Sequence, residues 1–138
     1  MTNKGRILVI EDNKDHINLI NQLNNKYKFT IDIGHNLHDF IELTSNGTYF
    51  DLILCDIDLD YQLEGLDILD YYKKQELKGD IYAYTLSSEN EVLFLEKGFK
   101  KVIKKDLNNL NGIFLELFNQ KNGKLQEKQD SIFIAEKI

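Results

Sequence analysis

Apolar residues along this chain gather in short runs, and these runs alternate with stretches of helical period. Residues 6–10, 51–55 and 81–84 are nearly continuous apolar runs, with the length expected of strands buried on both faces. Residues 29–33 alternate apolar and polar positions, which predicts a strand near a sheet edge. Residues 101–104 predict a short fifth strand.

Between the runs, apolar residues recur every three or four positions, as on one face of a helix. This spacing predicts helices over residues 13–24, 36–46, 65–77, 89–97 and 107–120. Asn13 and Asn36 are suited to cap the first two helices, while Gly47 and Gly98 are suited to end the second and fourth.

Five strand–helix units predict an α/β fold, a doubly wound parallel sheet with helices on both faces. A chain of 138 residues fits one such domain. In open sheets of this kind the functional crevice lies at the carboxyl ends of the strands.

Composition narrows the function classes. Hydrophobic residues make up 42% of the chain and charged residues 29%, a globular composition with no apolar stretch near the roughly 20 residues that span a membrane. Because the N-terminus is polar, no signal peptide is expected. The single cysteine, Cys55, lies in an apolar strand run, so its thiol is expected to be buried and inert. These features favour a cytoplasmic protein with no membrane partner. The net charge of −6 argues against direct binding of nucleic acid.

Polar residues stand at the ends of four of the five predicted strands. Glu11 and Asp12 follow the first strand, Asp56 the third, Thr85 the fourth and Lys105 the fifth. Carboxylates at the ends of buried strands cost desolvation energy unless something pairs with them, so these residues predict a site. Three close carboxylates repel one another, and an all-oxygen site of this charge suits Mg²⁺.

The order and spacing of these residues resemble the receiver domain of two-component response regulators (CheY-like), over about residues 5–120. The resemblance implies a flavodoxin-like (βα)5 fold with strand order 2-1-3-4-5. It implies Mg²⁺ ligation by Asp12 and Asp56, with Glu11 acting mainly through water. The backbone carbonyl of Asp58 is implied as a further ligand.

The resemblance also implies a function. Asp56 is expected to accept a phosphoryl group from a sensor histidine kinase or a histidine phosphotransfer protein, with Lys105 and Thr85 contacting that group. The protein then signals to an unknown downstream protein by conformational change. Such a domain catalyses only its own phosphorylation and dephosphorylation, so no separate enzyme activity is expected. A homodimer through the fourth and fifth helices is an option, as in many relatives.

Two positions have a neighbouring competitor. Lys104 competes with Lys105, although Lys105 lies seven places after Gly98, as the family's lysine does after its glycine. Ser87 competes with Thr85 for the role of the switch hydroxyl. The tyrosines of the fourth strand, at positions 82 and 84, are interpreted as half-buried packing residues.

Three positions depart from the family's pattern and leave a second function open. Leu86 stands where a small residue is usual, Val102 replaces a frequent aromatic residue, and Asp106 replaces a proline. A degenerate receiver that acts as a phosphorylation-independent interaction module is therefore the alternative. A third option compares Asp56 and Asp58 with the Asp-x-Asp motif of haloacid-dehalogenase-like phosphatases. That family usually has Thr or Val two places after its second aspartate, and here Asp60 stands there.

The last residues are assigned separately from the receiver, which is placed at residues 1–120. Residues 121–138 are expected to be a C-terminal tail or a linker. Residues 131–135 have a strand-like composition, which fits either a docked tail or the first strand of a further domain.

Overall fold

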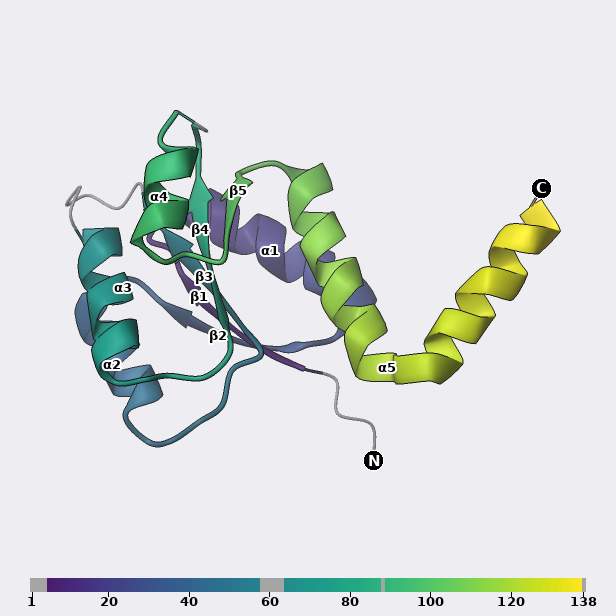
Figure 1. The fold of residues 1–138 in the computed structure, drawn as a ribbon, viewed down its shortest axis with the longest axis horizontal. Helices are drawn as coiled ribbons and strands as arrows, with labels where there is room; N and C mark the ends of the chain where they lie inside the picture. The colour runs from purple at the N-terminus through teal and green to yellow at the C-terminus, as the bar shows by residue number, and fades with distance from the viewer. Residues whose placement is uncertain (1–4, 58–63, 88, 138) are drawn as a thin grey trace.

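The computed structural model describes residues 5–57, 64–87 and 89–137, with side chains up to residue 122. Five strands alternate with five helices along the chain (Figure 1). The strands are β1 (Arg6–Ile10), β2 (Thr30–Gly34), β3 (Leu52–Asp56), β4 (Asp80–Thr85) and β5 (Lys101–Lys104). The helices are α1 (Lys14–Tyr27), α2 (Leu37–Thr44), α3 (Glu64–Lys74), α4 (Glu91–Lys97) and α5 (Leu107–Lys137).

All five strands form one parallel sheet in the order β2-β1-β3-β4-β5, as the family resemblance implied. β2 and β5 are the edge strands. Helices α1 and α5 pack together on one face of the sheet, and α2 and α3 pack together on the other (Figure 1). The predicted doubly wound fold is confirmed.

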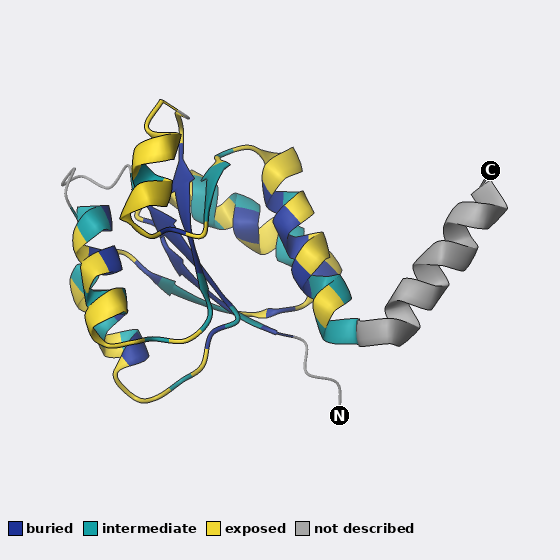
Figure 2. Cartoon of the chain, viewed as in Figure 1, coloured by how far each residue is buried: buried dark blue, intermediate teal, exposed yellow. Residues whose placement is uncertain are grey.

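Strand residues alternate between two cores because successive side chains point to opposite faces of a sheet. Ile7 and Val9 of β1 join the core beneath α1 and α5, whereas Leu8 and Ile10 join the core beneath α2 and α3. In β4, Tyr84 belongs to the first core and Ala83 to the second. The central strands are buried on both faces, whereas α4 has no buried residue and is exposed over most of its surface (Figure 2).

The predicted helix caps are present. The Asn13 side chain accepts hydrogen bonds from the backbone N–H groups of Asp15 and His16, and the Asn36 side chain accepts one from Asp39. These bonds satisfy donors that the first turn of a helix leaves unpaired.

Several helix boundaries differ from the predictions. Helix α3 ends at Lys74 rather than at residue 77, whereas two other helices are longer than predicted. Helix α1 continues past Asn24 to Tyr27 and ends at Lys28, which adopts a left-handed conformation with φ of 62°. Helix α5 continues to Lys137, so residues 131–135 are helical although their composition is strand-like. No proline interrupts this helix, and neither Gly112 nor Gly123 ends it.

Among the described residues, no helix combines the length and apolarity needed to cross a membrane.

Candidate functional site

The site lies at the carboxyl ends of β1 and β3, where the strand order changes direction. β2 lies on one side of β1 and β3 on the other, so the helices that follow β1 and β3 cover opposite faces of the sheet. Glu11 and Asp12 follow β1, and Asp56 is the last residue of β3. One oxygen of each carboxylate lies within 4.8 Å of the others.

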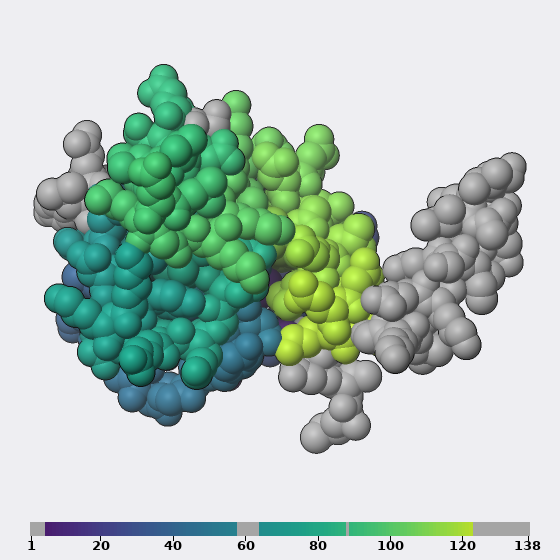
Figure 3. All heavy atoms as spheres, viewed as in Figure 1, coloured from purple at the N-terminus to yellow at the C-terminus, as the bar shows by residue number. Residues whose placement is uncertain are grey.

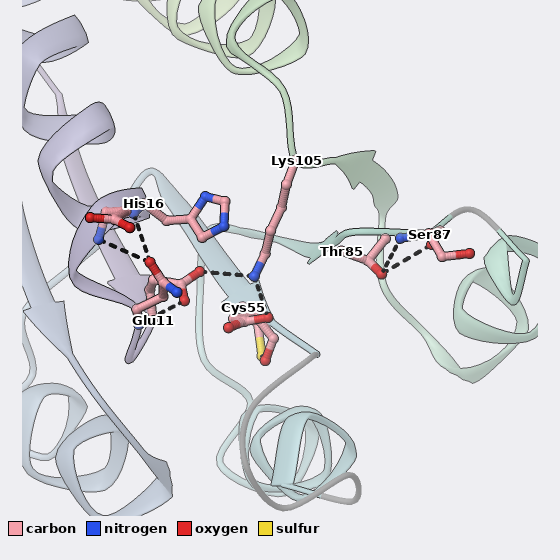
Figure 4. Close-up of polar contacts among 9 residues, drawn as sticks. Glu11, His16, Cys55, Thr85, Ser87 and Lys105 are labelled. Carbon is pink, nitrogen blue, oxygen red and sulfur yellow. Dashed lines mark hydrogen bonds and ion pairs between the residues drawn. The ribbon is translucent and has the colours of Figure 1, made fainter.

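Lys105 joins this group from the end of β5. Its Nζ lies 2.8 Å from Asp56 Oδ1 and 3.1 Å from Glu11 Oε2 (Figure 4). The Lys105 backbone N–H donates to the Thr85 carbonyl at 2.7 Å, which fixes the root of the side chain against β4. Lys104 is exposed on β5 instead, so of the two lysines the structure brings Lys105 to the carboxylates.

The three charged groups are almost completely enclosed. Exposed fractions are 0% for the Glu11 side chain, 1% for Asp56 and 3% for Lys105, whereas Asp12 is exposed. The cluster holds three carboxylates and one ammonium group, so it keeps a surplus of negative charge. Burial of this kind is costly unless each charge is paired.

Burial and charge shift the proton affinities within the cluster. Burial, together with the neighbouring Glu11, raises the pKa of Asp56 from 3.8 to about 7, even though Lys105 acts in the opposite direction. For Lys105, burial lowers the pKa, but hydrogen bonds and charges from Asp56 and Glu11 outweigh burial and raise it. Asp56 therefore sits in a site that disfavours its free anion and would gain from another cation.

The donor set fits a divalent metal ion. The ligand atoms are carboxylate oxygens, which Mg²⁺ and related hard cations prefer. The backbone of Asn13 holds Glu11 in place, because the Asn13 N–H donates to Glu11 Oε1 at 3.0 Å. Glu11 Oε2 is buried and lies 3.1 Å from Lys105 Nζ, and a carboxylate oxygen with two lone pairs has capacity for a further ligand. Asp58, whose carbonyl was predicted as a ligand, lies outside the described residues.

The Thr85 hydroxyl is engaged with its own loop. Thr85 Oγ1 donates to the Ser87 carbonyl at 3.0 Å and accepts from the Ser87 N–H at 3.2 Å. In Figure 4 these bonds lie on the side of Thr85 away from Glu11. The predicted competitor Ser87 is a hydrogen-bond partner of Thr85, so the two residues belong to one turn.

Sequence reasoning missed Tyr84 as a neighbour of the site. The tyrosines at positions 82 and 84 were predicted to be half-buried, but both are buried, and Tyr84 completely so. Lys105 Nζ lies 5.2 Å from the centroid of the Tyr84 ring, on the same side of the sheet as Asp56. The signal that could have found Tyr84 is the β3–β4 register, which a single sequence does not contain.

Cys55, one residue before Asp56, is buried, and burial raises the pKa of its thiol. A neutral thiol in this place is consistent with the predicted inert cysteine.

Comparison with known proteins identifies the family. The family model described as "Response regulator receiver domain" matches residues 7–113. The chain belongs to this family. No curated protein matches the sequence.

Solved receiver domains share its fold. The receiver domain of the Francisella response regulator 1452 superposes with a TM-score of 0.70 at 20% identity, covering 83% of this chain and 96% of that one. The Saccharomyces cerevisiae Ssk1 receiver domain, solved with the histidine phosphotransfer protein Ypd1, gives a TM-score of 0.69 at 19% identity, with coverage of 86% and 91%. The Mn²⁺-bound form of response regulator Rcp1 gives 0.64 at 19% identity, with coverage of 82% and 91%.

Proposed function

We propose that this receiver accepts a phosphoryl group on Asp56 in a Mg²⁺-dependent reaction and signals by a change of conformation. The observation that carries the proposal is the position of Lys105, whose ammonium group bridges Asp56 and Glu11 inside a buried acidic cluster. A buried lysine between two carboxylates is an expensive arrangement for stability alone. It suits a site that must balance the charge of an incoming phosphoryl group.

The transfer step follows from these groups. A carboxylate oxygen of Asp56 attacks phosphorus in a phospho-histidine donor, forming an acyl phosphate as the bond from phosphorus to the imidazole nitrogen breaks. The electron pair of that bond stays on the imidazole, which can then take up a proton. Lys105 already lies 2.8 Å from the attacking carboxylate, so its ammonium group is within reach of a phosphoryl oxygen.

Glu11, Asp12 and Asp56 would hold the Mg²⁺ ion. When bound, the ion supplies positive charge that offsets the repulsion between the carboxylates and the phosphoryl oxygens. The chain's own contribution is to fix Glu11 through the Asn13 N–H and to exclude water from Glu11 and Asp56.

The phosphoryl donor and the downstream partner are both proposed to be proteins. A related receiver was solved with a histidine phosphotransfer protein, which supports a sensor histidine kinase or a phosphotransfer protein as donor. For the output, α4 exposes Val92, Leu93 and Leu95, and α5 exposes Leu107 and Leu115. Figure 3 displays α4 and the first part of α5 on the same face of the molecule. Exposed apolar side chains of this kind suit a protein contact, with a downstream partner or a second copy.

Intact-mass measurement tests the proposal. The protein is incubated with acetyl phosphate in the presence of Mg²⁺ or of a chelator. We expect one phosphoryl adduct on the wild type with Mg²⁺ and none with the chelator. Asp56→Asn should abolish the adduct, and Asp70→Asn, at an exposed aspartate of α3, should keep it. An equal adduct on Asp56→Asn would contradict the assignment of Asp56.

The alternative, a phosphorylation-independent interaction module, is favoured by one specific observation. The Thr85 hydroxyl makes two hydrogen bonds to the backbone of Ser87, and the exposed Leu86 lies between these residues. If the hydroxyl never leaves this turn, the receiver does not switch. Amide chemical shifts around Ser87 that stay unchanged after full phosphorylation would favour the module, and shifts that Thr85→Ala abolishes would favour the switch.

A further inference from the structure

Tyr84 is the neighbour of Asp56 across the β3–β4 ladder. The Cα atoms of the two residues are register partners, and the Ile57 N–H donates to the Tyr84 carbonyl at 3.2 Å. Their side chains therefore leave the sheet on the same face. Tyr84 is 0% exposed, and its ring lines the space that Asp56 and Lys105 occupy.

The ring of Tyr84 lies against the ammonium group of Lys105. Nζ is 5.2 Å from the ring centroid, inside the range of about 6 Å over which a cation is attracted to an aromatic face. This attraction is stronger in a desolvated site, and the Lys105 side chain is only 3% exposed. Two carboxylates and one aromatic face thus surround the same charge.

A second ring holds Tyr84 from the side of α1. The His16 imidazole meets the Tyr84 ring edge to face, with a centroid distance of 6.4 Å and an interplanar angle of 82°. The backbone of His16 is held in the first turn of α1, because its backbone N–H donates a hydrogen bond to the Asn13 side chain. In Figure 4 the imidazole points toward the Lys105 side chain. The orientation of the Tyr84 ring is therefore set by packing and not by its hydroxyl, which has no hydrogen-bond partner among the described residues.

We propose that Tyr84 is a positioning residue for Lys105 in the phosphorylation of Asp56, an inference that rests on the function proposed above. As the Asp56 oxygen forms its bond to phosphorus, that oxygen loses negative charge, and its hold on Lys105 weakens. The face of Tyr84 keeps its attraction throughout the step, because its quadrupole does not change. It therefore keeps the ammonium group beside the phosphoryl oxygens while the ion pair to Asp56 is lost.

Substitutions of Tyr84 by rings of similar shape but different charge distribution distinguish this role from a role in core packing. Tyr84 is replaced in the whole chain by phenylalanine and by trifluorophenylalanine, because fluorine withdraws the negative charge from the ring face and changes its shape little. The rate constant for Mg²⁺-dependent phosphorylation by acetyl phosphate is then measured; in this reaction the Asp56 oxygen bonds to phosphorus and acetate leaves with its electron pair. We expect Tyr84→Phe to react within about twofold of wild type and the trifluorinated variant to react about three- to tenfold more slowly than Tyr84→Phe.

Tyr82 provides a matched control. It lies two residues earlier on the same face of β4, and Lys101 Nζ is 5.6 Å from its ring centroid. The same substitutions at Tyr82 should leave the rate unchanged, because Lys101 pairs with Glu116 on the outside of the domain. Equal rates across the Tyr84 series, or a faster trifluorinated variant, would overturn the proposal.

A spectroscopic signal distinguishes failure of this inference from failure of the proposed function. The ring current of Tyr84 should shift the Lys105 ε-methylene protons upfield in the unphosphorylated protein, and Tyr84→Leu should remove the shift. Absence of the shift from the wild type would overturn the placement of Lys105 against the ring. A wild type that shows the shift but accepts no phosphoryl group would contradict the proposed function and, with it, the role of Tyr84 in the transfer. Phosphorylation that is independent of the ring would contradict the role of Tyr84 alone.

Discussion

Asp56→Asn removes a buried carboxylate beside Glu11 and should stabilise the protein when no divalent ion is present. Burial and Glu11 raise the pKa of Asp56 from 3.8 to about 7. One pKa unit corresponds to roughly 1.4 kcal/mol. Ionising Asp56 above neutral pH therefore costs the folded state about 4 kcal/mol relative to the unfolded chain. This cost already includes the opposing attraction of Lys105, whose ammonium group lies 2.8 Å from Asp56 Oδ1. We therefore expect the free energy of unfolding to rise by up to about 4 kcal/mol.

The pH dependence fixes the sign of the effect. A carboxyl group with a raised pKa in the folded state binds more protons when folded, so its contribution to stability falls as pH rises from about 4 to about 7. Urea unfolding in a chelator, followed by circular dichroism, measures the difference between wild type and Asp56→Asn. The gain should be largest near neutral pH and should shrink toward about pH 4. Asp70→Asn, at an exposed position of α3, should change little at either pH.

A loss of stability in Asp56→Asn near neutral pH would refute this reasoning. It would mean that the ion pair with Lys105 outweighs the burial of Asp56 and the repulsion from Glu11. Addition of Mg²⁺ gives a further check, because an ion that binds only the folded state should stabilise the wild type and should stabilise Asp56→Asn less.

Three further predictions concern single residues. Lys105→Met keeps the stem of the side chain and removes its charge, and the phosphorylation rate should fall by about tenfold or more while Mg²⁺ still binds, as intact mass and isothermal titration can test. Tyr84→Phe removes a buried hydroxyl that has no partner among the described residues, so urea unfolding should find a free energy unchanged or up to about 1 kcal/mol higher. Gly79→Ala should cost about 2–4 kcal/mol in the same assay, because Gly79 has φ of 92° and a Cβ there would lie 1.9 Å from the Phe50 carbonyl oxygen.

The fold could be predicted because local signals and the global pattern agree. The buried strands appear as apolar runs, and Asn13 and Asn36 cap their helices as the sequence indicates. The end of α1 was misjudged for a physical reason. Asn24 looks like a helix terminator, but its side chain bonds the backbone of Phe29 from within the helix, accepting from the N–H and donating to the carbonyl.

The candidate site could be predicted only in part. The grouping of the acidic residues with Lys105 could be predicted because each of them stands at the end of a strand, and parallel strands end at one edge of the sheet. The state of the Thr85 hydroxyl and the contact between Tyr84 and Lys105 depend on loop conformation and strand register. Both are three-dimensional properties that residue spacing does not encode.

The central claim is that Asp56 carries the phosphoryl group, and chemical trapping tests it most directly. The wild type is phosphorylated with acetyl phosphate and Mg²⁺ and then treated with borohydride, which reduces an acyl phosphate to the alcohol and leaves serine and threonine phosphates intact. Peptide mass spectrometry should find position 56 converted to homoserine, and only when Mg²⁺ and the donor are both present. Conversion at another carboxylate, or a borohydride-resistant phosphate on a hydroxyl residue, would contradict the account.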